Sequence, residues 1–161
     1  IRQGGIDVPA LFQSITKHFS SALSSRKLDF SAQVNEDAKQ ARGDKTLIFI
    51  VIQNLVSNAI RYTPDGGKIK LVAEKLPGAI NFSVSDTGIG IDKSQHDLIF
   101  EKFYEVKDVN YHESGQYKFS SSGLGLGLAT VKSILAGHNS GITLESEPNQ
   151  GSTFSFRLPE A

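Results

Sequence analysis

Residues 45–62 read KTLIFIVIQNLVSNAIRY, a stretch with dense apolar positions that is too long for a strand. The pattern predicts a helix buried on most sides. We expect it to end at residues 63–67, Thr-Pro-Asp-Gly-Gly, because proline and paired glycines break a helix. Asn54 and Asn58 are four residues apart and therefore lie on one face of this helix. Amide side chains inside an apolar helix are costly unless hydrogen-bonded, so the two asparagines either cap neighbouring backbone groups or serve a ligand.

Further helices and strands are expected on both sides of residues 45–62. Upstream, Pro9 opens an amphipathic helix that runs to about Ser25. Leu28–Val34 alternates apolar and polar residues as a half-buried strand does, and the polar residues 35–44 indicate a loop. Downstream, the pattern predicts strands Lys68–Lys75 and Ala79–Ser85, a short helix Gln95–Phe100, a long loop Tyr104–Ser122, a helix Leu126–Ala136, and strands Ile142–Glu147 and Ser152–Leu158. This order predicts an α/β fold, a two-layer α/β sandwich with a mixed sheet packed on about three helices.

Length and composition limit the possible functions. The 161 residues suffice for about one domain with a single core. Seventeen basic and seventeen acidic side chains cancel, so no net field attracts nucleic acid or an anionic membrane. The absence of cysteine excludes disulfides, thiolate metal sites and a cysteine nucleophile. No apolar run is long enough to span a bilayer, and the chain starts at Ile1 and lacks methionine, so we expect a fragment of a longer protein.

Two glycine-containing stretches carry candidate chemistry. Asp86 ends a predicted strand and enters a tight turn at Gly88 and Gly90, where a carboxylate can accept a hydrogen bond from the exocyclic amine of adenine. An Asp-Thr-Gly sequence is also an ordinary turn. Gly123, Gly125 and Gly127 precede a predicted helix, where backbone amides and the helix N-terminus favour phosphate. The same spacing marks flexible loops, and it is neither a dinucleotide-binding fingerprint nor a P-loop, because no strand precedes it and no Gly-Lys-Ser/Thr follows.

The order of these stretches resembles the catalytic ATP-binding domain of two-component sensor histidine kinases, which has the Bergerat fold. The superfamily also contains gyrase, MutL and the heat-shock chaperone ATPases. The resemblance extends from about Asp7 to Pro159 and consists of an asparagine box at 53–63, glycine boxes at 86–91, 123–128 and 151–154, and a phenylalanine box at 99–104. It implies ATP and Mg²⁺ as ligands, with a long lid over the nucleotide.

The resemblance assigns a role to each matching residue. Asn58 would hold Mg²⁺, Asn54 would support the phosphate site, and Arg61 and Tyr62 would approach the phosphates and ribose; Asn54, Asn58 and Arg61 are thus the catalytic candidates. The other nucleotide-binding candidates are Asp86, Gly88, Gly90 and Ile91 at the adenine, Phe100 and Phe103 at the base of the lid, Lys102 as a substitute for the family's arginine near the γ-phosphate, Gly123, Leu124, Gly125, Leu126, Gly127 and Leu128 around the triphosphate, and Thr153 near the purine. Core packing is the alternative for Phe100 and Phe103, since aromatic side chains mostly bury area.

Asn54 also bears on the reaction. Relatives in the superfamily that hydrolyse ATP generally carry a glutamate here as general base for water, and an asparagine cannot take a proton at neutral pH. Transfer of the γ-phosphoryl group to a histidine is therefore favoured over hydrolysis by a gyrase-like ATPase. Glu105 and Leu124 depart from the family pattern, in which an arginine and a hydroxyl residue are common, and Asn149 replaces a common glycine. A degenerate nucleotide-binding regulatory module without phosphotransfer therefore stays open.

The acceptor histidine is expected outside this chain. His18, His96, His112 and His138 lie in no recognisable acceptor motif, and His18 is interpreted as a surface residue. The resemblance implies two protein partners, a histidine-bearing dimerisation domain of the same protein and a response regulator. It implies no nucleic acid and no membrane contact by these residues. The implied location is cytoplasmic, with any inner-membrane anchor elsewhere in the protein.

Overall fold

The computed structural model of the chain describes residues 1–101 and 127–161. Three α-helices occur in these ranges: α1 (Val8–Ser25), α2 (Lys45–Tyr62) and α3 (Gly127–Gly137). The strands are β1 (Gly4–Asp7), β2 (Asp29–Val34), β3 (Gln40–Gly43), β4 (Lys68–Leu76), β5 (Ala79–Asp86), β6 (Ile142–Ser146) and β7 (Ser152–Pro159). Short 3₁₀ turns cover Glu36–Ala38, Lys93–Gln95 and Leu98–Phe100.

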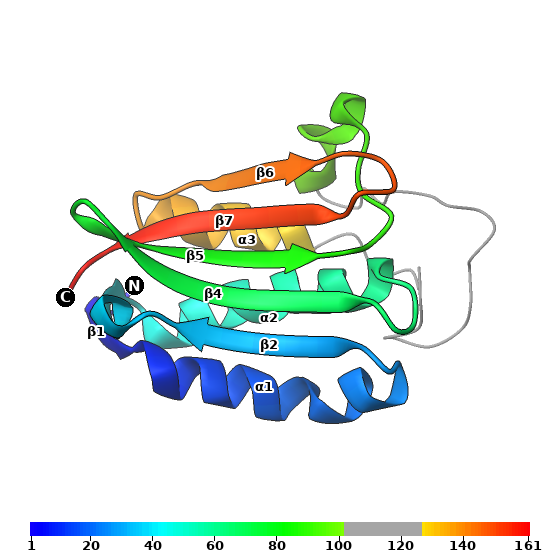
Figure 1. Cartoon of the computed structure of the whole chain (residues 1–161). Helices are drawn as coiled ribbons and strands as arrows, with labels where there is room; N and C mark the ends of the chain where they lie inside the picture. Colours follow the sequence, from blue (N-terminus) through cyan, green and yellow to red (C-terminus); the bar gives the residue numbers. More distant parts are fainter. Residues whose placement is uncertain (102–126) are drawn as a thin grey trace.

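The strands and helices form two layers. Five strands make one mixed sheet in the order β2-β4-β5-β7-β6, in which β2 runs parallel to β4 and the other pairs are antiparallel. All three α-helices lie against one face of this sheet (Figure 1). β1 and β3 form a separate two-stranded antiparallel sheet. The predicted two-layer α/β sandwich with a mixed sheet is therefore confirmed.

The core lies between the sheet and the helices. Strands β4, β5 and β7 turn alternate residues toward the helices, and these are buried: Ile69, Leu71 and Ala73, then Ile80, Phe82 and Val84, then Phe154, Phe156 and Leu158. The Phe82 ring stacks on Phe156 at 5.0 Å between centroids, and Phe12 of α1 meets Phe82 edge-on at 6.1 Å. Burial of this apolar face, at about 25 cal/mol per Å², holds the helices on the sheet.

Four local features differ from expectation or lie outside the described residues. The stretch expected to be a loop, residues 35–44, contains a 3₁₀ turn and strand β3. β1 was not predicted, because a four-residue strand gains stability only from its partner 33 to 39 positions away, a pairing that local pattern does not encode. The short helix expected at 95–100 is instead a pair of 3₁₀ turns. The long loop predicted at 104–122 falls outside the described residues.

The start of α2 is tied to the end of α3. The Asp44 carboxylate accepts hydrogen bonds from the Thr46 and Leu47 backbone amides, and so caps the helix. The buried His138 imidazole accepts from the Asp44 backbone N–H at Nε2, 3.0 Å away, and donates from Nδ1 to the Ile134 carbonyl, at 2.9 Å. One neutral tautomer satisfies both bonds. The helix that carries the two asparagines is thereby anchored to the neighbouring helix.

None of the helices in residues 1–101 and 127–161 has the length and apolar character needed to cross a membrane.

Candidate nucleotide site

The predicted site residues gather at one end of the sandwich. α2 and β5 end there and β7 begins there, on the right in Figure 1. The described candidates have these positions: Asn54, Asn58, Arg61 and Tyr62 in α2, Asp86 at the end of β5, Gly88, Gly90 and Ile91 in the loop after it, Phe100 in the second 3₁₀ turn of that loop, Gly127 and Leu128 in the first turn of α3, and Thr153 in β7. The candidates Lys102, Phe103, Gly123, Leu124, Gly125 and Leu126 lie outside the described residues, as does Glu105.

The two asparagines of α2 have different surroundings. The Asn54 amide nitrogen donates to the Ile50 carbonyl at 2.9 Å, so this side chain does bond its own helix backbone. A Cβ on Gly127 would come within 2.9 Å of Asn54 Oδ1, which places the start of α3 directly against the Asn54 amide. Asn58 is half-buried, and its amide makes no hydrogen bond within residues 1–101 and 127–161. A half-buried amide with no partner among these residues is available to solvent or to a ligand.

Asp86 carries a partly buried carboxylate. Its Oδ1 accepts from the Gly88 backbone N–H at 2.8 Å, and the Ser152 backbone N–H also donates to the carboxylate. Burial raises the pKa of the Asp86 carboxyl to about 6, although these two hydrogen bonds act in the opposite direction. A carboxylate offers about four acceptor positions. Two backbone donors leave acceptor positions of the Asp86 carboxylate available to an amine. A carboxyl group that is buried at a cost in desolvation free energy indicates a functional site.

The loop that follows Asp86 is packed against neighbouring backbone on both sides. The Ile89 N–H donates to the Tyr62 carbonyl at the end of α2, at 3.0 Å, and the Ile89 carbonyl accepts from the Asn149 N–H at 2.6 Å. A Cβ on Gly88 would lie 2.2 Å from the Tyr62 carbonyl oxygen. A Cβ on Gly90, whose φ is +70°, would lie 1.9 Å from the Glu147 carbonyl oxygen. These glycines are therefore required by contacts within the protein, which hold Asp86 in place.

Substitution of Gly88 by alanine is expected to displace this loop, because the obstructing atom is backbone and cannot rotate away. We expect Gly88→Ala to lower the free energy of unfolding by about 2–3 kcal/mol, as overpacking does, and to weaken adenosine binding. Urea denaturation and NMR titration with adenosine measure the two effects. Gly141→Ala is the matched control, because a Cβ there meets nothing within 4 Å. Equal stability of the two variants would contradict the expectation.

Hydroxyl-bearing residues lie where β5 and β6 end and β7 begins, near Asp86, and the sequence did not point to most of them. Ser152 pairs with Asp86 across β5 and β7. Thr153 and Ser85, the next pair in register, point to the opposite face of the sheet, where their hydroxyls are 2.9 Å apart. The Ser146 hydroxyl accepts from the Ile91 N–H at 2.8 Å and lies 2.8 Å from the Ser152 hydroxyl. Only the register of the strands brings these hydroxyl residues together, and the register is known only once the fold is known.

Phe100 packs against the sheet. Its ring meets Phe154 of β7 edge-on with centroids 6.3 Å apart, and the neighbouring Ile99 is buried. This contact fits core packing, the alternative considered for Phe100. Any further role at the base of a lid stays a prediction, because the segment after Glu101 is not described.

Comparisons with known proteins agree with these features. The sequence model of the family described as histidine kinase-, DNA gyrase B-, and HSP90-like ATPase matches residues 43–161. The sensor-like histidine kinase SenX3 of Mycolicibacterium smegmatis is 42% identical over 118 residues, which are 73% of this chain and 29% of SenX3. The chain thus spans less than a third of the length of that relative.

Solved structures give the same result. The catalytic domain of histidine kinase ThkA has a TM-score of 0.81 and 27% identity, with 99% of this chain and 97% of that chain covered. ThkA in complex with response regulator protein TrrA matches with a TM-score of 0.77 and 24% identity, over 99% of this chain and 42% of that one. Full-length ShkA in complex with AMPPNP shares the fold, with a TM-score of 0.82 and 23% identity over 100% of this chain and 32% of that one. The chain therefore belongs to the histidine kinase-, DNA gyrase B-, and HSP90-like ATPase family and is similar to the catalytic ATP-binding domains of sensor histidine kinases.

Proposed function

We propose that residues 1–161 act as a single catalytic ATP-binding domain that donates the γ-phosphoryl group of Mg-ATP to a histidine on a separate dimerisation helix. The observation that carries the proposal is the Asp86 carboxylate, which accepts from the Gly88 and Ser152 amides and whose pKa is raised by burial to about 6. Adenine presents an exocyclic amine that such an acceptor binds, and guanine has an oxygen at that position. The AMPPNP bound to ShkA, a protein of the same fold, is consistent with this assignment.

The phosphate end of the site is assigned to α2 and to the segment that leads into α3. Within the described part of the chain, no group of three or more histidine, aspartate or glutamate side chains is placed to hold a metal. Mg²⁺ commonly keeps waters and phosphate oxygens and takes few protein ligands, so the Asn58 amide oxygen suffices as its protein ligand. Bound Mg²⁺ would neutralise charge on the β- and γ-phosphates. Arg61 and Tyr62 would approach phosphate and ribose, and Gly123, Gly125 and Gly127 would bring backbone amides to the triphosphate.

Transfer is proposed over hydrolysis because of Asn54. Its amide nitrogen bonds Ile50 and its oxygen faces Gly127, and an amide has no basic group with which to activate water. A neutral imidazole of the acceptor needs no base in this domain. Its nitrogen lone pair attacks the γ-phosphorus, the bond from phosphorus to the β,γ-bridging oxygen breaks, and ADP leaves with that electron pair. The imidazole proton on the other nitrogen passes to solvent. The domain acts by positioning and charge neutralisation.

Two protein partners and a location complete the proposal. The phosphoryl acceptor is a histidine-bearing dimerisation domain of the same protein, and a response regulator receives the phosphoryl group afterwards. ThkA bound to the response regulator TrrA supports the second assignment. A cytoplasmic site of action follows from the use of ATP and from the response regulator.

The test mixes this domain with a helical dimerisation domain from a sensor histidine kinase and with ATP labelled at the γ-phosphate. Acid-labile, alkali-stable label on the helical domain, formed only with Mg²⁺, is the expected result. Release of free phosphate at the same rate without the helical domain would indicate an ATPase. Nucleotide binding with neither label transfer nor phosphate release would indicate a regulatory module. No binding at millimolar ATP would refute the nucleotide site itself.

A further inference from the structure

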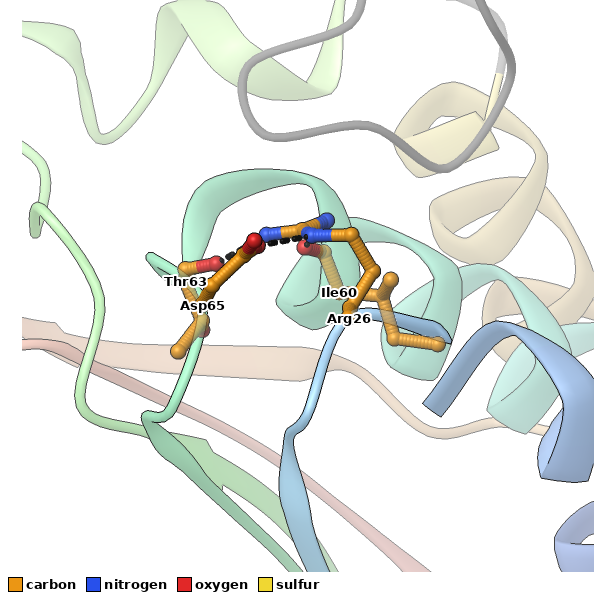
Figure 2. A network of polar contacts seen from close by, with 4 residues as sticks. All are labelled: Arg26, Ile60, Thr63 and Asp65. Carbon is orange, nitrogen blue, oxygen red and sulfur yellow. Dashed lines mark hydrogen bonds and ion pairs between the residues drawn. The ribbon is translucent and has the colours of Figure 1, made fainter. Parts of the chain in front are cut away.

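Arg26, outside the predicted site, has a buried guanidinium group at the end of α2. The residue caps the C-terminus of α1 and is 6% exposed; among the described residues it is the one Lys, Arg, Asp or Glu that is buried. Its Nη1 donates to the Ile60 carbonyl at 2.8 Å, Nη2 donates to the Thr63 carbonyl at 2.5 Å, and Nε donates to Asp65 Oδ1 (Figure 2). Burial of a cation costs free energy unless the cation is paired and hydrogen-bonded. The acceptors around the Arg26 guanidinium compensate this cost.

The two carbonyl bonds matter more than the ion pair. The last carbonyls of a helix have no partner within the helix, and a cation there also interacts favourably with the helix dipole. The Asp65 side chain is 64% exposed, so its attraction to Arg26 is screened by water. Arg26 therefore serves mainly to hold the backbone at residues 60–63.

The same backbone segment supports the loop that carries the adenine-binding candidates. The Tyr62 carbonyl accepts from the Ile89 N–H, and Gly88 packs against that carbonyl without room for a side chain. Beyond it, the Gly67 carbonyl accepts from the Asp29 N–H at 2.9 Å, and the Thr87 hydroxyl accepts from the Lys68 N–H at 2.9 Å. The end of α2 is thus fixed by Arg26 on one side and fixes the Asp86 loop on the other.

We propose that Arg26 is a positioning residue for nucleotide binding. By holding the Ile60 and Thr63 carbonyls, it fixes the position of the last turn of α2, which carries Arg61 and Tyr62. It thereby also fixes the distance from that turn to the Asp86 loop. The planar guanidinium reaches Ile60, Thr63 and Asp65 at fixed angles, whereas a lysine ammonium is a single point of charge on a flexible stem. The inference rests on the nucleotide site proposed above and adds a residue to its supporting structure.

The experiment compares three variants with the wild type. Arg26→Met removes the charge and the fork, Arg26→Lys keeps the charge alone, and Asp65→Asn removes only the exposed ion-pair partner. Calorimetric titrations with ATP and with GTP are made at a temperature at which circular dichroism shows each variant fully folded. We expect Arg26→Met and Arg26→Lys to weaken ATP binding about tenfold or more and to narrow the preference for ATP over GTP. Asp65→Asn should stay within about twofold of wild type.

Amide hydrogen exchange supplies a readout that a merely structural role would not change selectively. In Arg26→Lys we expect faster exchange of the Ile89 N–H, which bonds Tyr62, and unchanged exchange of the Asn35 N–H, which bonds Ala73 in β4. Equal acceleration at both amides, or wild-type ATP affinity in a folded but less stable variant, would overturn the inference. An Asp65→Asn effect as large as that of Arg26→Met would also overturn it, because the ion pair would then be the important contact. If Arg26→Met does not fold, Arg26→Lys decides. If the wild type binds no ATP, the proposed function fails first and the inference fails with it.

Discussion

Asp86→Asn is expected to weaken adenosine binding about 100-fold and to leave the protein folded. The wild-type carboxylate accepts from the Gly88 and Ser152 amides and, in the proposed site, from the adenine amine. The asparagine variant has one acceptor oxygen and places its own N–H₂ among these donors, so at least one charge-assisted hydrogen bond is lost, at a cost of about 1.5–3 kcal/mol. Adenosine is the right probe, because it has no phosphate that titrates near neutral pH. NMR titration measures the affinity.

The same carboxylate predicts how binding depends on pH. Burial raises the pKa of Asp86 to about 6, so the acceptor becomes protonated as the pH falls through that value. Adenosine affinity of the wild type should therefore fall below pH 6, by up to about tenfold per pH unit. The weaker affinity of Asp86→Asn should stay constant over the same range. A wild-type affinity that is constant between pH 7 and pH 5 would contradict the assignment of Asp86 as the adenine acceptor.

The free energy of unfolding should change with pH in the direction opposite to adenosine affinity. The pKa of Asp86 is raised from 3.8 to about 6 in the folded protein, so the folded state binds the proton more tightly than the unfolded state. The ionised carboxylate therefore destabilises the fold as the pH rises from about 4 to 6, by up to about 3 kcal/mol. Relative to wild type, Asp86→Asn should gain stability over this interval and keep a constant difference above it. Urea denaturation at several pH values checks the sign independently of any ligand.

The sequence predicted the layers of the fold because its apolar pattern is regular where the core is. Residues 45–62 form α2 with the predicted bounds, and β5 differs from its prediction by one residue at its end. β1 and β3 could not be predicted, since a pair of four-residue strands depends on a distant partner. Asn149 is a local feature that the structure explains. Its φ is +65°, a region that glycine enters freely and asparagine tolerates, which accounts for a residue other than glycine at this turn.

The candidate site could be proposed from the sequence only where its residues follow one another. Asn54, Asn58 and the Asp86 loop belong to recognisable segments, and the fold brings those segments to one end. Arg26 belongs to no such segment. Its acceptors Ile60, Thr63 and Asp65 are 34, 37 and 39 residues away, and nothing in the sequence around Arg26 distinguishes it from an exposed basic residue at a helix end. Supporting contacts of this kind are determined by tertiary packing.

Asn58→Ala is expected to abolish the Mg²⁺ dependence of ATP binding and to lower phosphoryl transfer to the helical acceptor about 1,000-fold. The amide oxygen of Asn58 is the proposed protein ligand to the metal, and loss of one fixed group that stabilises transition-state charge costs about 10²–10³ in rate. The loss should not come from unfolding. Within the described residues the Asn58 amide has no hydrogen-bond partner to leave unsatisfied, and alanine favours the helix more than asparagine does.

Gln53→Ala is the matched control for this substitution. Gln53 is an amide residue on the same helix, and its side-chain nitrogen lies 3.1 Å from the His18 ring nitrogen, on the side of α2 that faces α1. We expect Gln53→Ala to bind ATP and transfer phosphate as the wild type does. Calorimetry with and without Mg²⁺, followed by the labelled transfer assay, separates binding from chemistry. If Asn58→Ala keeps a Mg²⁺ dependence equal to that of Gln53→Ala, the metal has other ligands and Asn58 has no part in holding it. If binding keeps its Mg²⁺ dependence but transfer is lost, Asn58 acts on the reacting phosphate, and the metal assignment must move to another residue.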